Sequence, residues 1–212
     1  SAPAGILNTT SATPASNNLN IDFGVKVSPN LSSGAYSKQI VFTAVTNQVP
    51  THAMFIPGPN FNATLNAINP GKDAKNFKKS NTPLANLWQA TIVSTADSTR
   101  PIYMWYNPAD LTVYWWSDAD IVYADQNSAY MFGRINKYAN PLKVIDTRGI
   151  NTSRVKMMTR MFYAGRWPIK EIILNEFDTS NVEDMSEMFA VDPFGTVTDL
   201  PEPLNLTSFD TR

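Results

Sequence analysis

Alternating hydrophobic and polar positions mark the first regular stretch of the chain. Every second residue from Ile21 to Val27 is hydrophobic, and a second alternating run extends from Tyr36 to Ala44. A period of two residues is typical of β-strands, and the Pro, Asn and Gly residues between the two runs are typical of turns. The pattern predicts a β-hairpin over residues 19–49. Its Gly-x-Tyr step also resembles the final strand of bacterial immunoglobulin-like modules.

The segments on either side of this hairpin have different patterns. Residues 1–18 are small and polar with no sustained period, which predicts a linker or a flexible arm. After residue 49, prolines at 50, 57, 59, 70 and 83 allow only short elements. Phe61, Leu65 and Ile68 have helical spacing, and we expect a short helix between Asn60 as its N-cap and Pro70 as its stop signal.

Aromatic residues concentrate in three short runs at residues 87–94, 100–106 and 111–117. The β-prone composition of the runs and the turn-forming residues 107–110 predict a three-stranded meander. Successive side chains of a strand point to opposite faces, so adjacent Trp115 and Trp116 must point in opposite directions. Because aromatic side chains supply much of the contact area in recognition sites, the candidate ligand-binding residues are Trp105, Tyr106, Trp115 and Trp116.

One pattern of hydrophobic positions occurs almost twice. INTSRVKMMTRMF, at residues 150–162, is followed 27 positions later by FDTSNVEDMSEMF, at residues 177–189. In each copy a short hydrophobic strand precedes a turn, and the residues after the turn have the spacing of an amphipathic helix. The predicted helical stripes are Val155, Met158, Met161 and Phe162 in the first copy and Val182, Met185, Met188 and Phe189 in the second.

Stacking of the copies follows from their size. A unit this small cannot bury a hydrophobic stripe alone, so the repeats should pack on one another as in a solenoid. Ser180 and Glu183 have the spacing of a capping box for the second predicted helix. Two fragments extend the array, SAYMF at residues 128–132 and LTSFDTR at residues 206–212.

The repeat resembles a known family. FDTSNVEDMSEMF is similar to the DTSNVxDMSxMF repeat of BspA-like bacterial surface proteins, a leucine-rich-repeat-like family, and the resemblance extends over roughly residues 53–212. It implies a right-handed curved solenoid that is exposed on, or secreted from, a bacterial cell and used in adhesion or ligand contact. The first copy departs from the family pattern at Asn151, which replaces Asp, and carries a basic face formed by Arg154, Lys156 and Arg160.

The predicted fold class is therefore α/β, a short leucine-rich-repeat-like right-handed solenoid preceded by a β-rich N-terminal region. We expect an arm at 1–18, a β-hairpin at 19–49, an α+β capping region at 50–132 and the solenoid at 133–212. The solenoid is expected to stop in mid-repeat, with an open hydrophobic end.

Composition excludes several classes of function. The chain has 212 residues, 43% of them hydrophobic, which is enough for a sizeable core. Its net charge is −1 with 17% charged residues, so no basic surplus attracts nucleic acid. The hydrophobic runs are far shorter than the roughly 18 residues of a membrane span, so no membrane insertion is expected. The chain contains no Cys, which excludes disulfides and thiol catalysis.

Catalytic and metal-binding residues are sparse. His52 is the only histidine, so any Ser-His-Asp arrangement depends on it, and the sequence favours no enzyme and no cofactor. Asp118, Asp120 and Asp125 offer oxygen ligands of the kind that calcium prefers, but they lack the spacing of an EF-hand loop. Turn formation and capping are the alternative roles for these three aspartates.

Three functional hypotheses follow. The first is a non-enzymatic module for adhesion or ligand recognition, located outside the cell or on a bacterial surface and contacting a protein or glycan of a host or a neighbouring cell. The second is a structural spacer or assembly subunit that associates through further repeats or its open C-terminal end. The third is an accessory domain of a polysaccharide-active enzyme.

Overall fold

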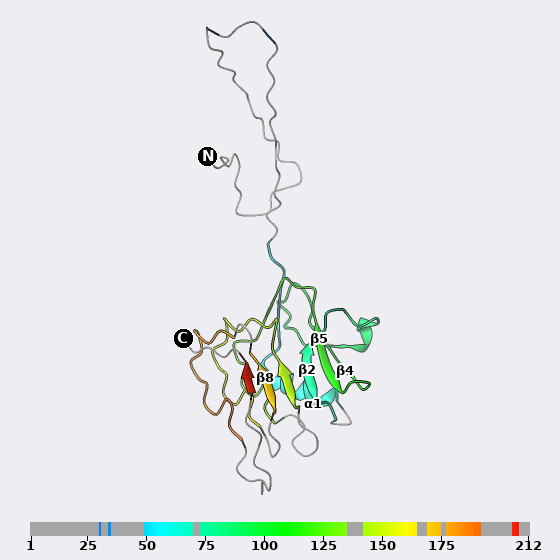
Figure 1. Cartoon of the computed structure of the whole chain (residues 1–212), viewed down its shortest axis with the longest axis vertical. Coiled ribbons are helices and arrows are strands. Elements are labelled where there is room, and N and C mark those ends of the chain that lie inside the picture. Colours follow the sequence, from blue (N-terminus) through cyan, green and yellow to red (C-terminus); the bar gives the residue numbers. More distant parts are fainter. Residues whose placement is uncertain are drawn as a thin grey trace. The chain divides into compact units, whose positions relative to one another are not determined.

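The computed structural model describes Asn30, Gly34, residues 49–69, 73–134, 142–164, 169–174 and 177–191, and the backbone of residues 205–207. The chain divides into two compact units, Ser1–Val49 and Pro50–Arg212 (Figure 1). The predicted arm and nearly all of the predicted hairpin lie outside the described residues. The following description concerns the second unit.

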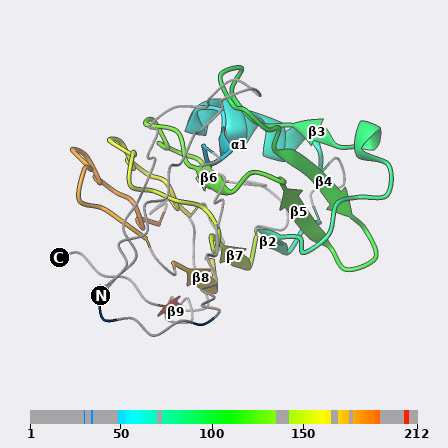
Figure 2. The same cartoon turned by 90° about the horizontal axis from the view of Figure 1, so that it is seen from above.

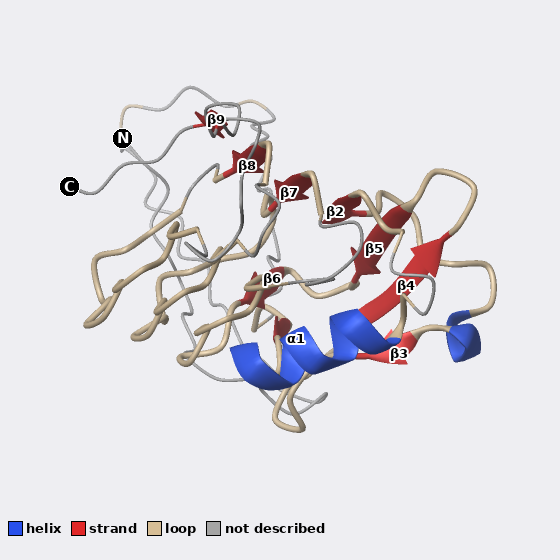
Figure 3. Cartoon of the chain, turned by 90° about the horizontal axis from the view of Figure 1, so that it is seen from below, coloured by secondary structure: helices blue, strands red, loops and turns tan. Residues whose placement is uncertain are grey.

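An open seven-stranded sheet is the largest element of the second unit, which is mixed α/β and built mainly from strands (Figure 3). The strand order is β3-β4-β5-β2-β7-β8-β9. The strands are β2 (Asn76–Lys79), β3 (Thr91–Ile92), β4 (Tyr103–Asn107), β5 (Thr112–Trp116), β7 (Val144–Asp146), β8 (Glu171–Ile173) and β9 (Asn205–Thr207). A separate parallel pair joins β1 (His52–Met54) to β6 (Ile121–Tyr123).

The antiparallel part of the sheet is the predicted aromatic meander. β4 pairs with both β3 and β5 in antiparallel register, which confirms three consecutive antiparallel strands, although residues 93–102 separate β3 from β4. The connection between β4 and β5 contains the predicted turn residues and ends at Leu111, whose φ is 54°. Trp115 is fully buried and Trp116 is half-buried, so the predicted opposite orientation of these neighbours is confirmed.

The parallel part of the sheet follows the sequence repeat. β2, β7, β8 and β9 are successive parallel neighbours. Ile145 of β7 lies opposite Ile172 of β8, 27 positions later, and both side chains are fully buried. The hydrophobic strand positions predicted for the two copies are therefore confirmed, and they point into one core.

Helix α1 (Gly58–Ala67) covers part of the core face of the sheet (Figure 3). Phe61 and Leu65 are buried as predicted, but the N-cap is Pro57 and not Asn60, because the helix begins three residues further upstream than expected. Phe61 packs edge-to-face on Phe55 and Phe77, with ring centroids 5.4 and 5.8 Å apart. The only other helical element in the described residues is the 3-10 helix η1 (Leu87–Gln89).

The predicted helices of the repeat are absent, and this part of the prediction is wrong. Residues 152–163 and 179–190 form successive tight turns in which an N–H donates to the carbonyl three residues earlier, as from Val155 to Thr152 and from Met161 to Met158. Turns of this kind reproduce the three-residue spacing of hydrophobic positions that also marks a helix. Ser180 and Glu183 therefore cap no helix.

Hydrogen bonds between neighbouring copies replace those of a helix. In the segment from 128 to 134, alternate N–H groups donate to carbonyls of residues 157–163, and alternate N–H groups of residues 158–164 donate to residues 184–190. Met158 N to Asp184 O, at 2.8 Å, is one example. Figure 2 shows the three turn segments, coloured green, yellow and orange, side by side. Residues 128–132 therefore form the first of three stacked segments.

A left-handed backbone conformation occurs at the same place in each stacked segment. Tyr130, Arg160 and Glu187 have φ values of 58°, 54° and 53°, although none is glycine. Arg160 joins the three positions, since its guanidinium donates to the Tyr130 hydroxyl at 2.6 Å and to both oxygens of Glu187 at 2.8 Å. These contacts stabilise a conformation that costs roughly 1–2 kcal/mol for an L-residue.

Phenylalanine rings stack through the three segments. Phe162 lies between Phe132 and Phe189, with ring centroids 5.6 Å apart and planes 3° apart on both sides. Val155, Met158, Met161, Phe162 and Met188 are buried, and Val182 and Phe189 are half-buried against the same core. The predicted shared hydrophobic core is therefore confirmed except at Met185, which is 40% exposed.

Candidate functional site

The antiparallel strands carry an exposed aromatic face. On β4 and β5, Tyr103 stacks on Trp116 and Trp105 stacks on Tyr114, with ring centroids 6.3 and 5.8 Å apart. All four side chains are half-buried, and each pair joins residues that lie directly opposite each other in the antiparallel register. Opposite residues share one face of a sheet, so the four rings form a single layer on the side away from the core.

A groove of about 600 Å³ crosses this face of the sheet. Its floor includes Trp105 of β4, Tyr114 of β5 and Lys78 of β2, which form one row because Lys78 pairs with Tyr114 and Tyr114 with Trp105. One wall is the loop of residues 80–85 that follows β2. The groove therefore lies across the junction between the aromatic meander and the parallel strands.

Charged side chains line one end of the groove. Arg148 donates from Nε to both carboxylate oxygens of Asp146, at 2.9 and 3.0 Å, and its Nη2 also pairs with that carboxylate. Asp146 is buried, whereas 60% of the Arg148 side chain is exposed. The hydrogen bonds that Arg148 donates to Asp146 raise the pKa of Arg148, so the guanidinium stays charged and is held in position.

The aromatic end of the groove is also held by polar contacts. The Lys78 ammonium lies 5.3 Å from the centroid of the Tyr114 ring, a cation–π contact. The Tyr114 hydroxyl donates to Asp110 at 2.7 Å, and this hydrogen bond raises the pKa of Tyr114. Tyr114 is therefore neutral at physiological pH, with its ring orientation set by contacts at both its face and its hydroxyl.

The four predicted contact residues have different positions. Trp105 lines the groove, and Trp116 lies on the same aromatic face. Trp115 has no exposed surface, because it points into the core and packs edge-to-face on Phe55 at 5.3 Å. The expectation that Trp115 offers a contact surface is therefore corrected.

Tyr106 requires the same correction. It lies on the opposite face of β4 from Trp105 and packs against the core. Its hydroxyl donates to Asp73 at 2.7 Å. Partial burial, together with this hydrogen bond and the nearby carboxylate charge, raises the pKa of Tyr106 to about 12. The Tyr106 hydrogen bond thus links β4 to the segment preceding β2, and the side chain does not face the groove.

Several groove residues were missed by the sequence reasoning. Tyr114 alternates with Trp116 along β5, and this alternation alone assigns both to the face opposite Trp115. No local signal identified Lys78, since its pairing with Tyr114 depends on residues 36 positions apart. No local signal identified Arg148, because β7 joins β2 only through the parallel sheet.

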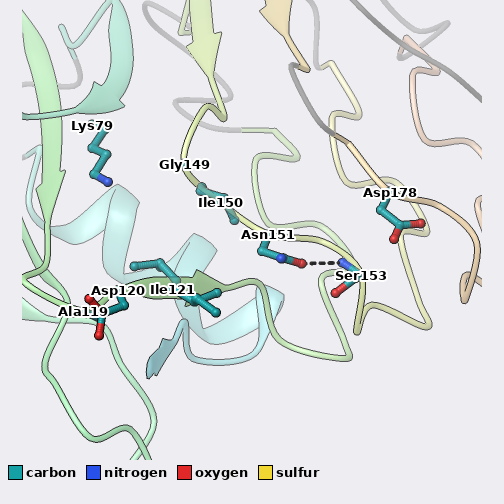
Figure 4. A pocket seen from close by; sticks show the side chains of 10 residues that line it. Lys79, Ala119, Asp120, Ile121, Gly149, Ile150, Asn151, Ser153 and Asp178 are labelled. Carbon is teal, nitrogen blue, oxygen red and sulfur yellow. Dashed lines mark hydrogen bonds between the residues drawn. The ribbon is translucent and has the colours of Figure 1, made fainter. Parts of the chain in front are cut away.

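A second, smaller pocket of about 320 Å³ lies between the end of β2, the segment before β6 and the turn after β7 (Figure 4). Polar side chains dominate its lining, among them Lys79, Asp120, Asn151 and Asp178. Figure 4 shows Asp120 and Asp178 on opposite sides of this pocket, with Asn151 between them. Its two carboxylates are therefore separated, and its Asn151 side chain accepts a hydrogen bond from the backbone of Ser153.

The three aspartates considered as calcium ligands have separate partners. Asp118 lies 3.8 Å from Arg100, and Asp125 accepts a hydrogen bond from the backbone of Asn127. Asp120 accepts hydrogen bonds from the hydroxyl and backbone of Thr51, which lower its pKa. In the part of the chain that the structure describes, no three acidic or histidine side chains gather in a way that holds a metal ion. Turn formation therefore accounts for Asp125, whereas Asp118 and Asp120 contact residues distant in the sequence.

Comparison with known proteins concerns mainly the stacked segments. Residues 126–195 match the model of a protein family. That family is described as "Mycoplasma protein of unknown function, DUF285". The matched region includes β7, β8 and the three stacked turn segments, and it covers about a third of the chain. Neither a curated protein sequence nor a solved structure matches the chain significantly. Among the described residues, no helix has the length and hydrophobicity needed to span a bilayer.

Proposed function

We propose that this chain is a non-enzymatic recognition module of a bacterial surface or secreted protein, and that its groove binds a ligand on a host or neighbouring cell. The observation that carries the proposal is the stacked, half-buried Trp105–Tyr114 pair that lines a groove of about 600 Å³. Half-exposed aromatic rings supply contact area at low entropic cost. Concave sites with a few placed polar groups are the usual form of ligand-binding sites.

The groove is preorganised, which supports a binding role. Its floor is part of a sheet with paired strands on both sides, and Asp146 holds Arg148 while Lys78 and Asp110 fix Tyr114. A site whose side chains are already in position loses little conformational entropy when a ligand binds. The same rigidity is expected of a module that must hold a ligand without chemical turnover.

We further propose that the region from β7 onward is the start of a short right-handed solenoid of the BspA-like type. The support is the parallel succession of β2, β7, β8 and β9, the hydrogen-bonded turn segments and the phenylalanine stack. The family match at residues 126–195 agrees with the motif resemblance over the same repeat. An extracellular location is part of this proposal and rests on the resemblance.

Glycan and host-protein arrays probed with the purified chain test the recognition role. The expected result is at least one saturable ligand whose binding is lost in Trp105→Ala. Trp88→Ala is the matched control, because Trp88 is 81% exposed on η1 and does not line the groove. Silence on both arrays at high protein density, or binding that survives Trp105→Ala, would count against the groove as the functional site.

A further inference from the structure

We propose that the groove binds a carboxylate-bearing saccharide, with the sugar against the exposed parts of the stacked Trp105 and Tyr114 rings and its carboxylate between Lys78 and Arg148. This inference rests on the proposed recognition function and specifies the ligand of that same groove. Three observations carry it: the charge of the lining, the order of aromatic and cationic groups across the floor, and the pairing of the strands below.

The lining of the groove is more positive than the rest of the chain. It contains the cations Lys78, Lys79 and Arg148 against the single acid Asp146, whereas the whole chain has a net charge of −1. Asp146 is already engaged by Nε and Nη2 of Arg148, and within the described part of the chain Nη1 of Arg148 has no partner. Three cations against one acid leave the lining with an excess of positive charge, which favours an anionic group.

The order of groups along the floor matches a ligand with an apolar face and an acidic substituent. Trp105 and Tyr114 are consecutive in one row, with their planes 24° apart, and Lys78 is the next residue of that row. A pyranose ring offers C–H groups on its face and hydroxyls around its edge. Because the two rings stack on each other and the Lys78 ammonium lies 5.3 Å from the Tyr114 centroid, a sugar that contacts the exposed parts of these rings also lies beside the Lys78 ammonium. Arg148 lines the same groove and is the second cation available to its carboxylate.

Strand pairing favours a saccharide over an extended peptide. β5 lies between β4 and β2, and β2 lies between β5 and β7, so the backbone groups of the floor are used within the sheet. A peptide that binds as an added strand needs an unpaired edge, and this floor has none. Recognition must come from side chains, and the groove also offers the neutral hydrogen-bonding groups of Ser80, Thr82 and Asn107 to hydroxyls.

A matched pair of ligands tests the inference. Calorimetric titration of the full chain with trigalacturonic acid and with its methyl ester compares ligands that differ in the carboxylate charge. We expect the acid to bind at least tenfold more tightly than the ester, and added NaCl to reduce this preference. Lys78→Gln should weaken binding of the acid more than binding of the ester, Trp105→Ala should abolish binding of both, and Trp88→Ala should change neither. Unfolding midpoints of the variants verify that each is folded.

The alternative outcomes separate this inference from the proposed function. Equal affinity for acid and ester, lost in Trp105→Ala, overturns the carboxylate assignment and supports the groove as a sugar site. Trp105-dependent binding of an oligoglutamate peptide without binding of the saccharide overturns the inference in favour of an acidic peptide. If no probe binds, the inference is wrong, and the arrays then decide whether the groove has another ligand.

Discussion

Replacement of Phe162 tests whether the stacked segments stabilise the fold. Phe162 is 1% exposed and lies between two parallel rings at 5.6 Å, with Phe177 at 6.3 Å. Burial of a phenylalanine side chain contributes about 1.5–3 kcal/mol, and each aromatic pair adds about 0.5–1.5 kcal/mol. Phe162→Ala removes these contacts and leaves a cavity, so we expect a loss of about 3–5 kcal/mol in the free energy of unfolding.

Urea unfolding followed by tryptophan fluorescence measures this loss, because Trp115 is in the same core. The slope of the unfolding free energy against urea concentration should be the same in the variant and the parent, so that a shift in the midpoint reports a change in stability alone. Phe162→Leu keeps most of the side-chain volume, so it should lower the free energy of unfolding by less than about half as much as Phe162→Ala. In a thermal scan, a loss of this size lowers the midpoint by roughly 6–20 °C in a unit of this length.

Met157→Ala is the control, because Met157 lies in the same segment but is 40% exposed. Its truncation should change the free energy of unfolding by less than about 1 kcal/mol. If Phe162→Ala costs no more than Met157→Ala, the ring stack does not stabilise the unit. The structural account of the repeat would then be wrong.

Four further variants test individual contacts. The backbone N–H of residue 186 and neighbouring hydroxyls lower the pKa of Asp184 below its ordinary value of 3.8. Ionised Asp184 should therefore stabilise the fold above pH 3.8, and this contribution should be lost as the pH falls through the lower pKa of the folded state. On acidification, the urea midpoint of Asp184→Asn should consequently decrease less than that of the parent. The raised pKa of Tyr106, about 12, means that its contribution to stability is present below about pH 10 and lost as the pH rises toward 12. In a spectroscopic titration, the phenolate absorbance of Tyr106 is the part that is missing in Tyr106→Phe, and it should appear only near pH 12. Asp73→Asn removes a hydrogen bond and a nearby charge, so it should move this absorbance to lower pH. Gly58→Ala places a Cβ 2.3 Å from the carbonyl oxygen of Ala129, so its unfolding free energy should fall by about 1–3 kcal/mol or more.

The repeat illustrates why part of the fold was accessible from sequence. The 27-residue offset between the two copies sets the register of β7 on β8, and hydrophobic side chains at equivalent places must share one core because neither copy can bury them alone. Alternation along β4 and β5 likewise determined the meander and the opposite orientations of Trp115 and Trp116. These features depend on local periodicity, which the chain carries without knowledge of its partners.

The conformation of the repeat after each strand was decided by tertiary contacts. A spacing of three residues is common to a helix and to a series of tight turns, and here the N–H groups find carbonyls in the neighbouring segment. The left-handed conformations of Tyr130, Arg160 and Glu187 are supported by contacts between segments, which no single copy contains.

The sequence by itself determined which residues are hydrophobic, where the strands of the meander and of the repeat form, and that the copies must stack. Only the tertiary structure decided that Trp105, Tyr114, Lys78 and Arg148 lie around one groove, and that Trp115 and Tyr106 do not. The physical reason is that these side chains come from the three strands β4, β5 and β2 and from the turn after β7, and no local pattern in the sequence specifies the order of these strands in the sheet. Long-range pairing brings them to one face, and the burial of the opposite face keeps them there.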